Sequence, residues 1–511
     1  MAKLLQKWFL FYPIVISALF VSACGDSSVT VVTTGEPVYP FNAGYGYVHS
    51  GTTPAAAGLS GSNQLDIGRT VRIDSKGRIV VAGYSQYIIG GYNRVALWRY
   101  KSDGTLDSTF GTGGIVTSGP NSANGSTSAQ FGNDFVQDME IDSQGRIVVT
   151  GYTRKVGAGT QTAVWRYNED GTLDSTFGAG GIVVGSSTGL AGGLTTGQND
   201  VPQAVVLNSK GQIIITGFSQ TSTGGSYKMF IERHLLNGFL DPTFGTGGLV
   251  LSASSGTTAA GGTVANLYEL GSDVVVDSQD RVIVAGPSKN NTPSSELALW
   301  RYTADGILDS TFGTAGVVHY GATSIAGATG ANQFDFPSRL AVDSQGRILV
   351  AGYSQTSTSG SWKMFLVRYS AAGVLDSSFG TAGVVLSAVG GTTAAGGTGS
   401  NLYELGNDVK LDSQNRILVA GVSRNAAGRG EMALWRYTGN GTLDSTFGTG
   451  GIVHFGTTGA AGATGIATSD AGNSLAIDAL DRVAVTGSSR NAGAGAEMAV
   501  WRYLSTGVLD K

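Results

Sequence analysis

The sequence predicts an all-β protein in which seven similar four-stranded units close into a ring. The phrase LDSTFG and its close variants recur about every 67 residues and end the chain as Leu509-Asp510-Lys511. Short runs of β-branched and apolar residues separate the copies, and no stretch keeps the 3.6-residue apolar spacing of a helix. A long repeat of this kind is one supersecondary unit copied many times, and seven copies of four strands describe a β-propeller.

One unit can be followed strand by strand between residues 132 and 184. The turn at 143–145 contains a glycine, which tolerates the positive φ that tight turns require. β-branched and apolar residues predict the strands on either side of it and the two that follow. The four strands are expected at 133–142, 146–152, 162–167 and 181–184.

The two ends of the chain predict how the ring closes. The seventh copy lacks the phenylalanine and the fourth strand, whereas residues 41–49 resemble residues 312–319, which hold both. We therefore expect an N-terminal strand to complete the last blade, so that residues 41–511 form one closed propeller without an exposed edge. The main alternative is an open β-solenoid, whose stack needs atypical caps at both ends.

The repeated motifs DSQGRIVVTG, AVWRYNEDGTLDSTFG and GIV resemble the delta-60 repeat family of bacterial β-propellers. The resemblance spans residues 41–510 and implies the propeller fold. Members of that family are largely uncharacterised, so the resemblance implies almost nothing about function. The units of this chain are longer than the typical repeat of the family, and the excess lies in the loops.

Residues 1–23 have the features of a targeting segment rather than of the fold. Lys3 and Lys7 precede an apolar run that ends in small residues before Cys24, the single cysteine of the chain. This pattern resembles the lipobox of bacterial lipoproteins, which implies cleavage before Cys24 and a membrane anchor on its thiol. Residues 24–40 are then a tether. The residue after the cysteine is not aspartate, which favours the outer membrane or cell surface; an ordinary secretory signal is the alternative.

Composition narrows the possible functions. The formal net charge is −4, only 13% of residues are charged, and no basic cluster is present, so nucleic acid is not an expected partner. With Cys24 acylated, no cysteine remains for disulfides or thiol chemistry. The sequence contains no HExxH, GxSxG or Walker-type motif, and it predicts no cofactor and no catalytic residue.

Residues that recur in every copy are interpreted as scaffold. The aspartate of LDSTFG and the arginine of the third strand occur in each unit, and they suit a capped turn and an ion pair within the blade. His49, His319 and His454 occupy one equivalent position on an outer strand, so they are expected on different blades and not as a metal trio. The acid of the Asp-Gly turns is replaced in several copies, which argues against calcium.

The long loops on one face of the predicted disc are the expected place for binding. Two nearly identical loops lead to the pairs Tyr268-Glu269 and Tyr403-Glu404, which are candidate binding residues. The alternative is that this segment only leads into the first strand and packs. We expect a binding or scaffold module for protein or glycan. Enzymatic activity is the less favoured interpretation; an extracytoplasmic hydrolase or lyase would gather carboxylates at the channel mouth.

Overall fold

Residues 39–511 form one compact unit in the computed structural model. The predicted targeting segment 1–23, Cys24 and the predicted tether 24–40 lie outside the described residues. No helix within the described part of the chain is long and apolar enough to span a membrane. The structure describes residues 41–44, 46–50, 65–86, 93–117, 133–155, 159–185, 190, 199–221, 226–252, 258, 260, 268–289, 294–320, 325–326, 334–356, 361–387, 392–397, 403–455, 469–490 and 495–511.

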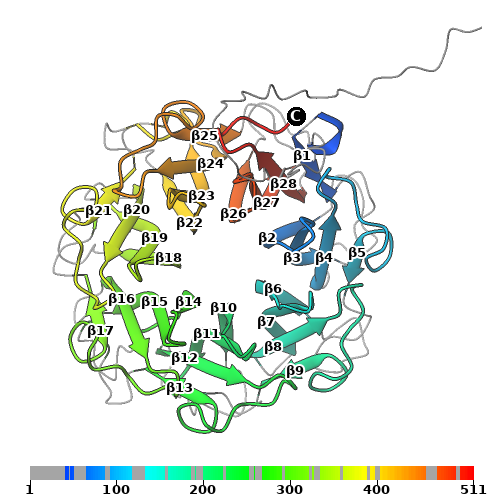
Figure 1. Cartoon of the computed structure of the whole chain (residues 1–511), viewed down its shortest axis with the longest axis vertical. Coiled ribbons are helices and arrows are strands. Elements are labelled where there is room, and N and C mark those ends of the chain that lie inside the picture. Colours follow the sequence, from blue (N-terminus) through cyan, green and yellow to red (C-terminus); the bar gives the residue numbers. More distant parts are fainter. Residues whose placement is uncertain are drawn as a thin grey trace, which may run out of the picture. The chain divides into compact units, whose positions relative to one another are not determined.

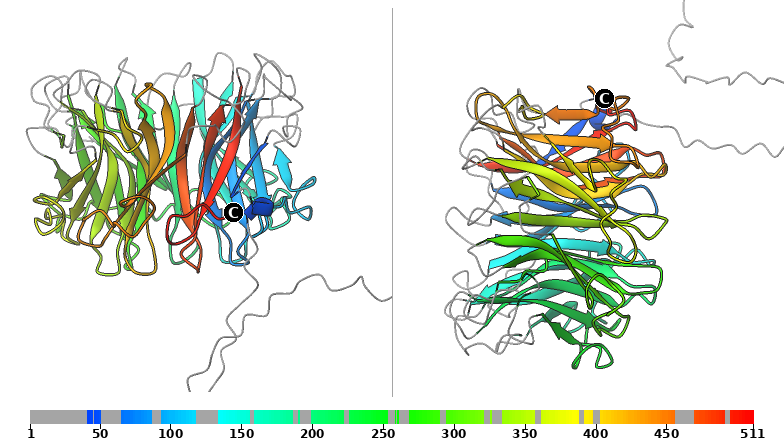
Figure 2. Two further views of the ribbon diagram at one scale, coloured as in Figure 1. Left: turned by 90° about the horizontal axis from the view of Figure 1, so that it is seen from above. Right: turned by 90° about the vertical axis from the view of Figure 1, so that its left-hand side faces the viewer.

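The chain forms seven antiparallel four-stranded sheets arranged radially around a central axis (Figure 1), and the predicted seven-bladed β-propeller is confirmed. Blades 1 to 6 each use four consecutive strands, from β2–β5 to β22–β25. Figure 2 shows the same blades with the disc seen edge on. The inner strands are β2 (Asp66–Ile73), β6 (Asn133–Ile141), β10 (Asp200–Leu207), β14 (Asp273–Val276), β18 (Asp335–Val342), β22 (Glu404–Leu411) and β26 (Asp470–Ile477).

The second and third strands of each blade form the buried middle of the sheet. Second strands are β3 (Ile79–Gln86), β7 (Ile147–Lys155), β11 (Ile213–Gln220), β15 (Val282–Lys289), β19 (Ile348–Gln355), β23 (Ile417–Arg424) and β27 (Val483–Arg490). Third strands are β4 (Asn93–Tyr100), β8 (Gly159–Tyr167), β12 (Tyr227–His234), β16 (Ser295–Tyr302), β20 (Trp362–Tyr369), β24 (Gly430–Tyr437) and β28 (Ala496–Tyr503).

The outer strands are short and follow the LDSTFG phrase. They are β5 (Ile115–Thr117), β9 (Ile182–Val184), β13 (Leu249–Leu251), β17 (Val317–His319), β21 (Val384–Leu386), β25 (Ile452–Phe455) and, from the other end of the chain, β1 (Tyr47–His49). In blade 2, the four strands match the expected ranges to within a few residues, and Gly145 in the first turn has the positive φ of 77° that the sequence predicts. Helical structure within the described residues is the short 3-10 turn η1 (Phe41–Gly44).

The hydrophobic core lies between blades rather than inside any one of them. One cluster joins Val80, Leu97 and Phe110 of blade 1 to Val149 and Trp165 of blade 2, and all five are at most 1% exposed. Similar clusters fill the other interfaces. Because a single sheet cannot bury both of its faces, each blade depends on its two neighbours.

The recurring Asp and Arg residues fasten each blade to the next. In blade 1, Arg99 Nε donates to Asp107 Oδ2 at 2.8 Å, its guanidinium lies 4.5 Å from the ring centroid of Phe110, and Nη1 donates to the carbonyl oxygen of Glu169 in blade 2. The same ion pair occurs in every blade: Arg99–Asp107, Arg166–Asp174, Arg233–Asp241, Arg301–Asp309, Arg368–Asp376, Arg436–Asp444 and Arg502–Asp510. These residues are therefore scaffold, as the sequence predicts.

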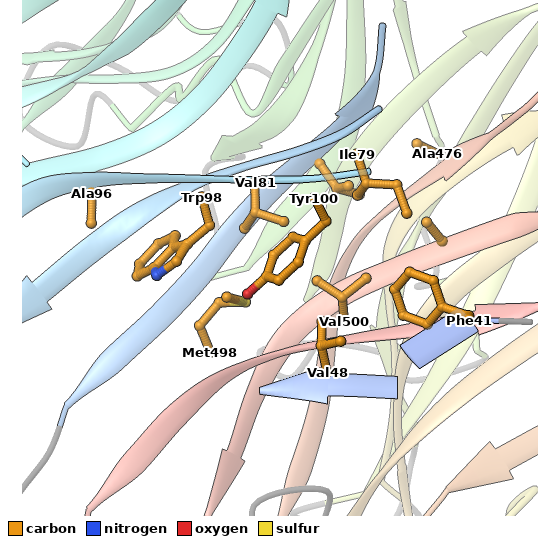
Figure 3. Packing of buried hydrophobic residues seen from close by; sticks show 12 residues of the cluster. Phe41, Val48, Ile79, Val81, Ala96, Trp98, Tyr100, Ala476, Met498 and Val500 are labelled. Carbon is orange, nitrogen blue, oxygen red and sulfur yellow. The ribbon is translucent and has the colours of Figure 1, made fainter. Parts of the chain in front are cut away.

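The N-terminal segment closes the ring within blade 7. β1 pairs antiparallel with β28, and Val48 lies opposite Val500 (Figure 3). Phe41 is fully buried under Arg502, 4.6 Å from its guanidinium, in the place that Phe110 occupies in blade 1. The Arg502 guanidinium in turn donates to the carbonyl oxygen of Ser102, so blade 7 is fastened to blade 1 by the same set of bonds. The predicted closure is confirmed.

Candidate functional site

A β-bulge near the start of the inner strands turns polar side chains into the channel. The pairing of inner and second strands shifts by one residue in every blade but blade 4, where β14 starts just after the equivalent position. Bulges re-aim a side chain and are common beside binding sites. The residues left unpaired are Arg69, Gln137, Gln203, Ser338, Asn407 and Asn473, and Ser272 takes this place in blade 4.

A glycine on the second strand makes the bulge possible. A Cβ atom added to Gly83 would lie 1.8 Å from the carbonyl oxygen of Ile67, and one added to Gly352 would lie 2.2 Å from that of Phe336. Both distances are far below contact, so the bulged backbone needs a glycine opposite it. This glycine occurs in every blade, as in the segments VVAGY and VVTGY.

These side chains line a pocket at one end of the channel, which we call the mouth. Its volume is about 440 Å³, within the range of small-ligand sites. The mouth lies at the end of the blades where the chain enters the inner strands. Its wall holds one polar residue from each blade, together with Phe218, Leu270, Pro287, Phe336, Pro337, Arg339 and Tyr353.

Polar groups of the mouth in blades 6, 7, 1 and 2 are linked from one blade to the next. Arg69 Nη2 donates to Gln137 Oε1 at 2.7 Å. Asn407 Nδ2 donates to the carbonyl oxygen of Gly472 at 2.8 Å, and Asn473 Nδ2 donates to that of Gly68 at 2.7 Å. Each bond joins one blade to the next, so the side chains of the wall are held in place before any ligand arrives.

Arg339 forms the floor of the mouth by reaching across the channel. Its Nη1 lies 2.9 Å from Asp138 Oδ2 and 3.0 Å from Asp273 Oδ1. Asp138 belongs to blade 2 and Arg339 to blade 5, which are not neighbours, so side chains cross the opening that the ribbons leave in Figure 1. Although burial opposes ionisation of Asp138, the guanidinium groups of Arg339 and Arg72 lower its pKa to about 2.

Asp138, Asp273 and Asp408, in blades 2, 4 and 6, each also bind the blade that follows. Their carboxylates accept hydrogen bonds from the backbone N–H groups of Val205, Leu340 and Leu475 in the following blades, at 3.3, 2.7 and 2.9 Å. Burial raises the pKa of Asp273, even though Arg339 opposes that shift. These acids are structural, because cations or backbone donors satisfy each of them.

Aromatic rings lie in the wall of the mouth in blade 5 and near Arg69 in blades 1 and 2. In blade 5, Phe336 stacks on Tyr353 with centroids 5.4 Å apart, and Trp362 lies 5.9 Å from Phe336. On blades 1 and 2, Phe135 stacks on Tyr152 at 4.9 Å and meets Tyr84 edge on at 5.2 Å. The equivalent inner-strand positions of blades 6 and 7 hold Leu405 and Ala471, so the aromatic wall is not a product of the repeat.

A second ring of acids lies at or near the start of the inner strands, and all seven are at most 3% exposed. They are Asp66, Asp134, Asp200, Glu269, Asp335, Glu404 and Asp470. Asp335 Oδ1 accepts hydrogen bonds from Ser354 Oγ at 2.5 Å and from the backbone N–H of Ile325 at 3.0 Å. Burial raises the pKa of Asp335 to about 7 and that of Asp200 to about 6.

This ring predicts a specific pH dependence. Between about pH 4 and 7, folded Asp335 holds a proton that the unfolded chain has released, so its contribution to stability falls as pH rises through this window. The free energy of unfolding of Asp335→Asn, measured relative to the wild type, should therefore rise by on the order of 3 kcal/mol between pH 4.5 and pH 8. Urea denaturation at both pH values measures the change. Asp376→Asn is the control, because a hydrogen bond from Ser378 lowers the pKa of the carboxyl that it removes. The difference in unfolding free energy between Asp376→Asn and the wild type should be the same at both pH values. The prediction is contradicted if the difference between Asp335→Asn and the wild type is also the same at both pH values.

The predicted binding residues Tyr268, Glu269, Tyr403 and Glu404 do not line the mouth. Glu269 and Glu404 belong to the buried ring, where Ser288 Oγ and Ser423 Oγ donate to them at 3.1 and 3.0 Å. Tyr268 and Tyr403 form bridges to the starts of β12 and β20 in the preceding blades. The structure thus places Glu404 at the start of β22 and Glu269 four residues before β14, and both glutamates are fully buried.

Other predicted features lie far from the mouth. His49, His319 and His454 occupy outer strands of three blades, and each pairs with a glutamate of the adjacent third strand.

A larger cavity of about 850 Å³ lies between blades 5 and 6, and Glu404, Trp435 and Tyr437 contribute to its lining. The seven polar bulge residues of the mouth were missed from the sequence, although each of them follows the acid of the buried ring in its blade by three residues.

The fold and the mouth define a closed β-propeller with an amide-rich, aromatic-walled pocket at one end of its channel. Five segments match the family described as "Domain of unknown function (DUF5122) beta-propeller": residues 77–110, 143–177, 280–312, 344–379 and 415–447. The matched segments fall in the repeats on which the delta-60 resemblance rests. The match supports a bacterial β-propeller domain and assigns no activity.

Solved structures with a similar fold are distant in sequence. The polysaccharide lyase Uly1 has 10% identity and a TM-score of 0.48 over 86% of this chain and 90% of its own. A PL25 ulvan lyase has 12% identity and a TM-score of 0.44 over 88% and 96%. The GH93 α-L-arabinofuranosidase of Fusarium graminearum has 12% and 0.40 over 73% and 94%. These similarities carry no argument about activity. No curated protein matches the sequence.

Proposed function

We propose that this chain is a glycan-binding β-propeller of the bacterial cell envelope, held to a membrane through a lipid on Cys24. The observation that carries the binding role is the mouth, where every blade contributes a polar side chain and aromatic rings stand beside them. Amides and hydroxyls both donate and accept hydrogen bonds, as sugar hydroxyls require. Aromatic faces supply flat apolar surface for the carbon face of a sugar ring.

The size of the mouth favours a glycan over a folded protein. A stable protein interface covers about 800 Å² on each partner. A recessed pocket of about 440 Å³ instead suits a few sugar rings or the end of a chain. The anchor rests on the lipobox-like residues before Cys24, and it would keep the binding module at the membrane that carries it.

The wall of the mouth also favours binding over hydrolysis or elimination. None of the described residues that line it is an aspartate, glutamate or histidine. The nearest channel acids, Asp138 and Asp273, are already bound by Arg339. A general base must be unprotonated within reach of the substrate, and burial raises the pKa of Tyr353, the phenol in the wall, which keeps it protonated.

Affinity gel electrophoresis on a panel of polysaccharides tests the proposal. At least one polysaccharide should retard the protein, and Phe336→Ala should weaken that binding about tenfold, because it removes the stacking surface. Phe239→Ala is the matched control, since Phe239 is 68% exposed on the turn between β12 and β13 at the opposite face. Equal binding by Phe336→Ala and wild type would place the glycan elsewhere. Cleavage products that disappear on substitution of one carboxylate would instead support the enzymatic alternative.

A further inference from the structure

Two charged residues line the mouth, and they differ in how their charges are compensated. Arg339 pairs with Asp138 and Asp273 on the floor. Arg69 lies higher on the wall, at the bulge of β2, where the other blades carry Gln, Ser or Asn. Arg69 is therefore specific to one blade and is not a product of the repeat.

Among the described residues, no carboxylate lies within ion-pair distance of Arg69. Its hydrogen bond to Gln137 Oε1 uses one of five guanidinium hydrogens. Burial lowers the pKa of Arg69 and the nearby charge of Arg339 lowers it further, while Tyr84, Tyr152 and the more distant Asp138 only partly oppose this shift. Holding a buried cation without an adjacent anion costs stability, so a cation kept open to a pocket indicates a ligand that supplies the negative charge.

The surroundings of Arg69 fit a sugar that carries this charge. The phenols of Tyr84 and Tyr152 are close enough to influence the pKa of Arg69, and Phe135 stacks on Tyr152 and meets Tyr84 edge on. Gln137 accepts from Arg69 through Oε1, so its Nε2 hydrogens remain donors for a ligand. A sugar ring against the aromatic groups would bring a carboxylate or sulfate substituent to the guanidinium.

We propose that Arg69 binds the anionic substituent of an acidic sugar, so that the mouth selects anionic polysaccharides over neutral ones. This inference rests on the proposed function and specifies its ligand. The whole chain carries a formal net charge of −4, so general attraction for a polyanion would not produce the same preference. The planar guanidinium fork matches either a carboxylate or a sulfate.

The test compares matched polymers that differ only in charge. Wild type should bind polygalacturonate, dextran sulfate or both at least about tenfold more tightly than the corresponding carboxyl-reduced galactan or dextran. Arg69→Met should abolish this preference. Lys101→Met is the control, because it removes the same charge from an exposed position on the opposite face. The two polymer pairs separate a carboxylate ligand from a sulfate ligand.

The outcomes separate failure of the inference from failure of the proposed function. Equal binding of charged and neutral polymers by wild type, unchanged in Arg69→Met, would overturn the inference and leave glycan binding standing. If no polymer binds but free galacturonate or sulfate raises the melting temperature of wild type and not of Arg69→Met, the anion site stands and the polysaccharide role fails. The melting temperature of unliganded Arg69→Met should not fall, because the variant loses an uncompensated charge.

Discussion

Replacing Phe41 by alanine should lower the free energy of unfolding by about 3–5 kcal/mol, the usual cost of emptying a buried phenylalanine site. Phe41 is fully buried, lies under Arg502 and packs in the cluster that joins blade 7 to blade 1. Deleting residues 41–50 should lower stability further, because β28 would lose its outer partner and the ring would acquire an exposed edge. Urea denaturation and thermal melts of the full chain measure both changes.

A matched variant separates closure from simple loss of packing. Phe110→Ala removes the equivalent ring between blades 1 and 2 and should cost about the same as Phe41→Ala. Only the deletion should also promote association between chains, which light scattering detects, because only the deletion exposes β28. A deletion variant that melts like the wild type would contradict the closed ring.

The closure could be predicted because the last repeat is incomplete and the missing part occurs near the start of the sequence. Residues 509–511 break off where the other copies continue with phenylalanine and a short strand, and residues 41–49 supply both. The inter-blade role of the arginines was harder to foresee. Six of the seven arginines reach a carbonyl oxygen about 70 residues further along, and Arg502 reaches back to Ser102 in blade 1. These contacts follow from the ring rather than from any local pattern.

The mouth could not be predicted, for two physical reasons. A bulge adds one residue to a strand, so the simple alternation of buried and exposed positions fails where Arg69 and its equivalents turn inward. The second reason is separation along the chain, since Arg339 and Asp138 are 201 residues apart. Glu269 and Glu404 looked like loop residues in the sequence, yet Glu404 begins β22, Glu269 lies just before β14, and both are fully buried.

Replacing Arg339 by serine, the residue that blade 7 carries as Ser474, should cost about 3–5 kcal/mol at pH 7. The substitution leaves the buried carboxylates of Asp138 and Asp273 without their shared cation. Their pKa values should then rise, so the folded variant takes up protons as pH falls from 7 to 4 while the unfolded chain does not. The stability difference from wild type should therefore narrow over that range.

A second substitution tests the cause of this loss. Arg339→Ser combined with Asp273→Asn removes one of the stranded charges and should recover part of the stability, whereas Asp273→Asn alone should not stabilise the protein at pH 7. Denaturation curves of the three variants and the wild type form a double-mutant cycle that measures the coupling. If the free energy of unfolding of Arg339→Ser lay within about 1 kcal/mol of the wild-type value, Arg339 would not stabilise the buried carboxylates of Asp138 and Asp273, and the prediction would be wrong.

The position of η1 determines on which face of the propeller the chain joins the disc relative to the mouth. The backbone N–H of Asn42 donates to the carbonyl oxygen of Asp103, in the turn between the third and outer strands of blade 1, so the chain enters the disc at the face of these turns (Figure 2). The mouth opens at the opposite ends of the blades. Phe41 therefore joins the propeller at the face away from the mouth, so a link to a biosensor chip through the segment before Phe41 does not enter the disc through the mouth.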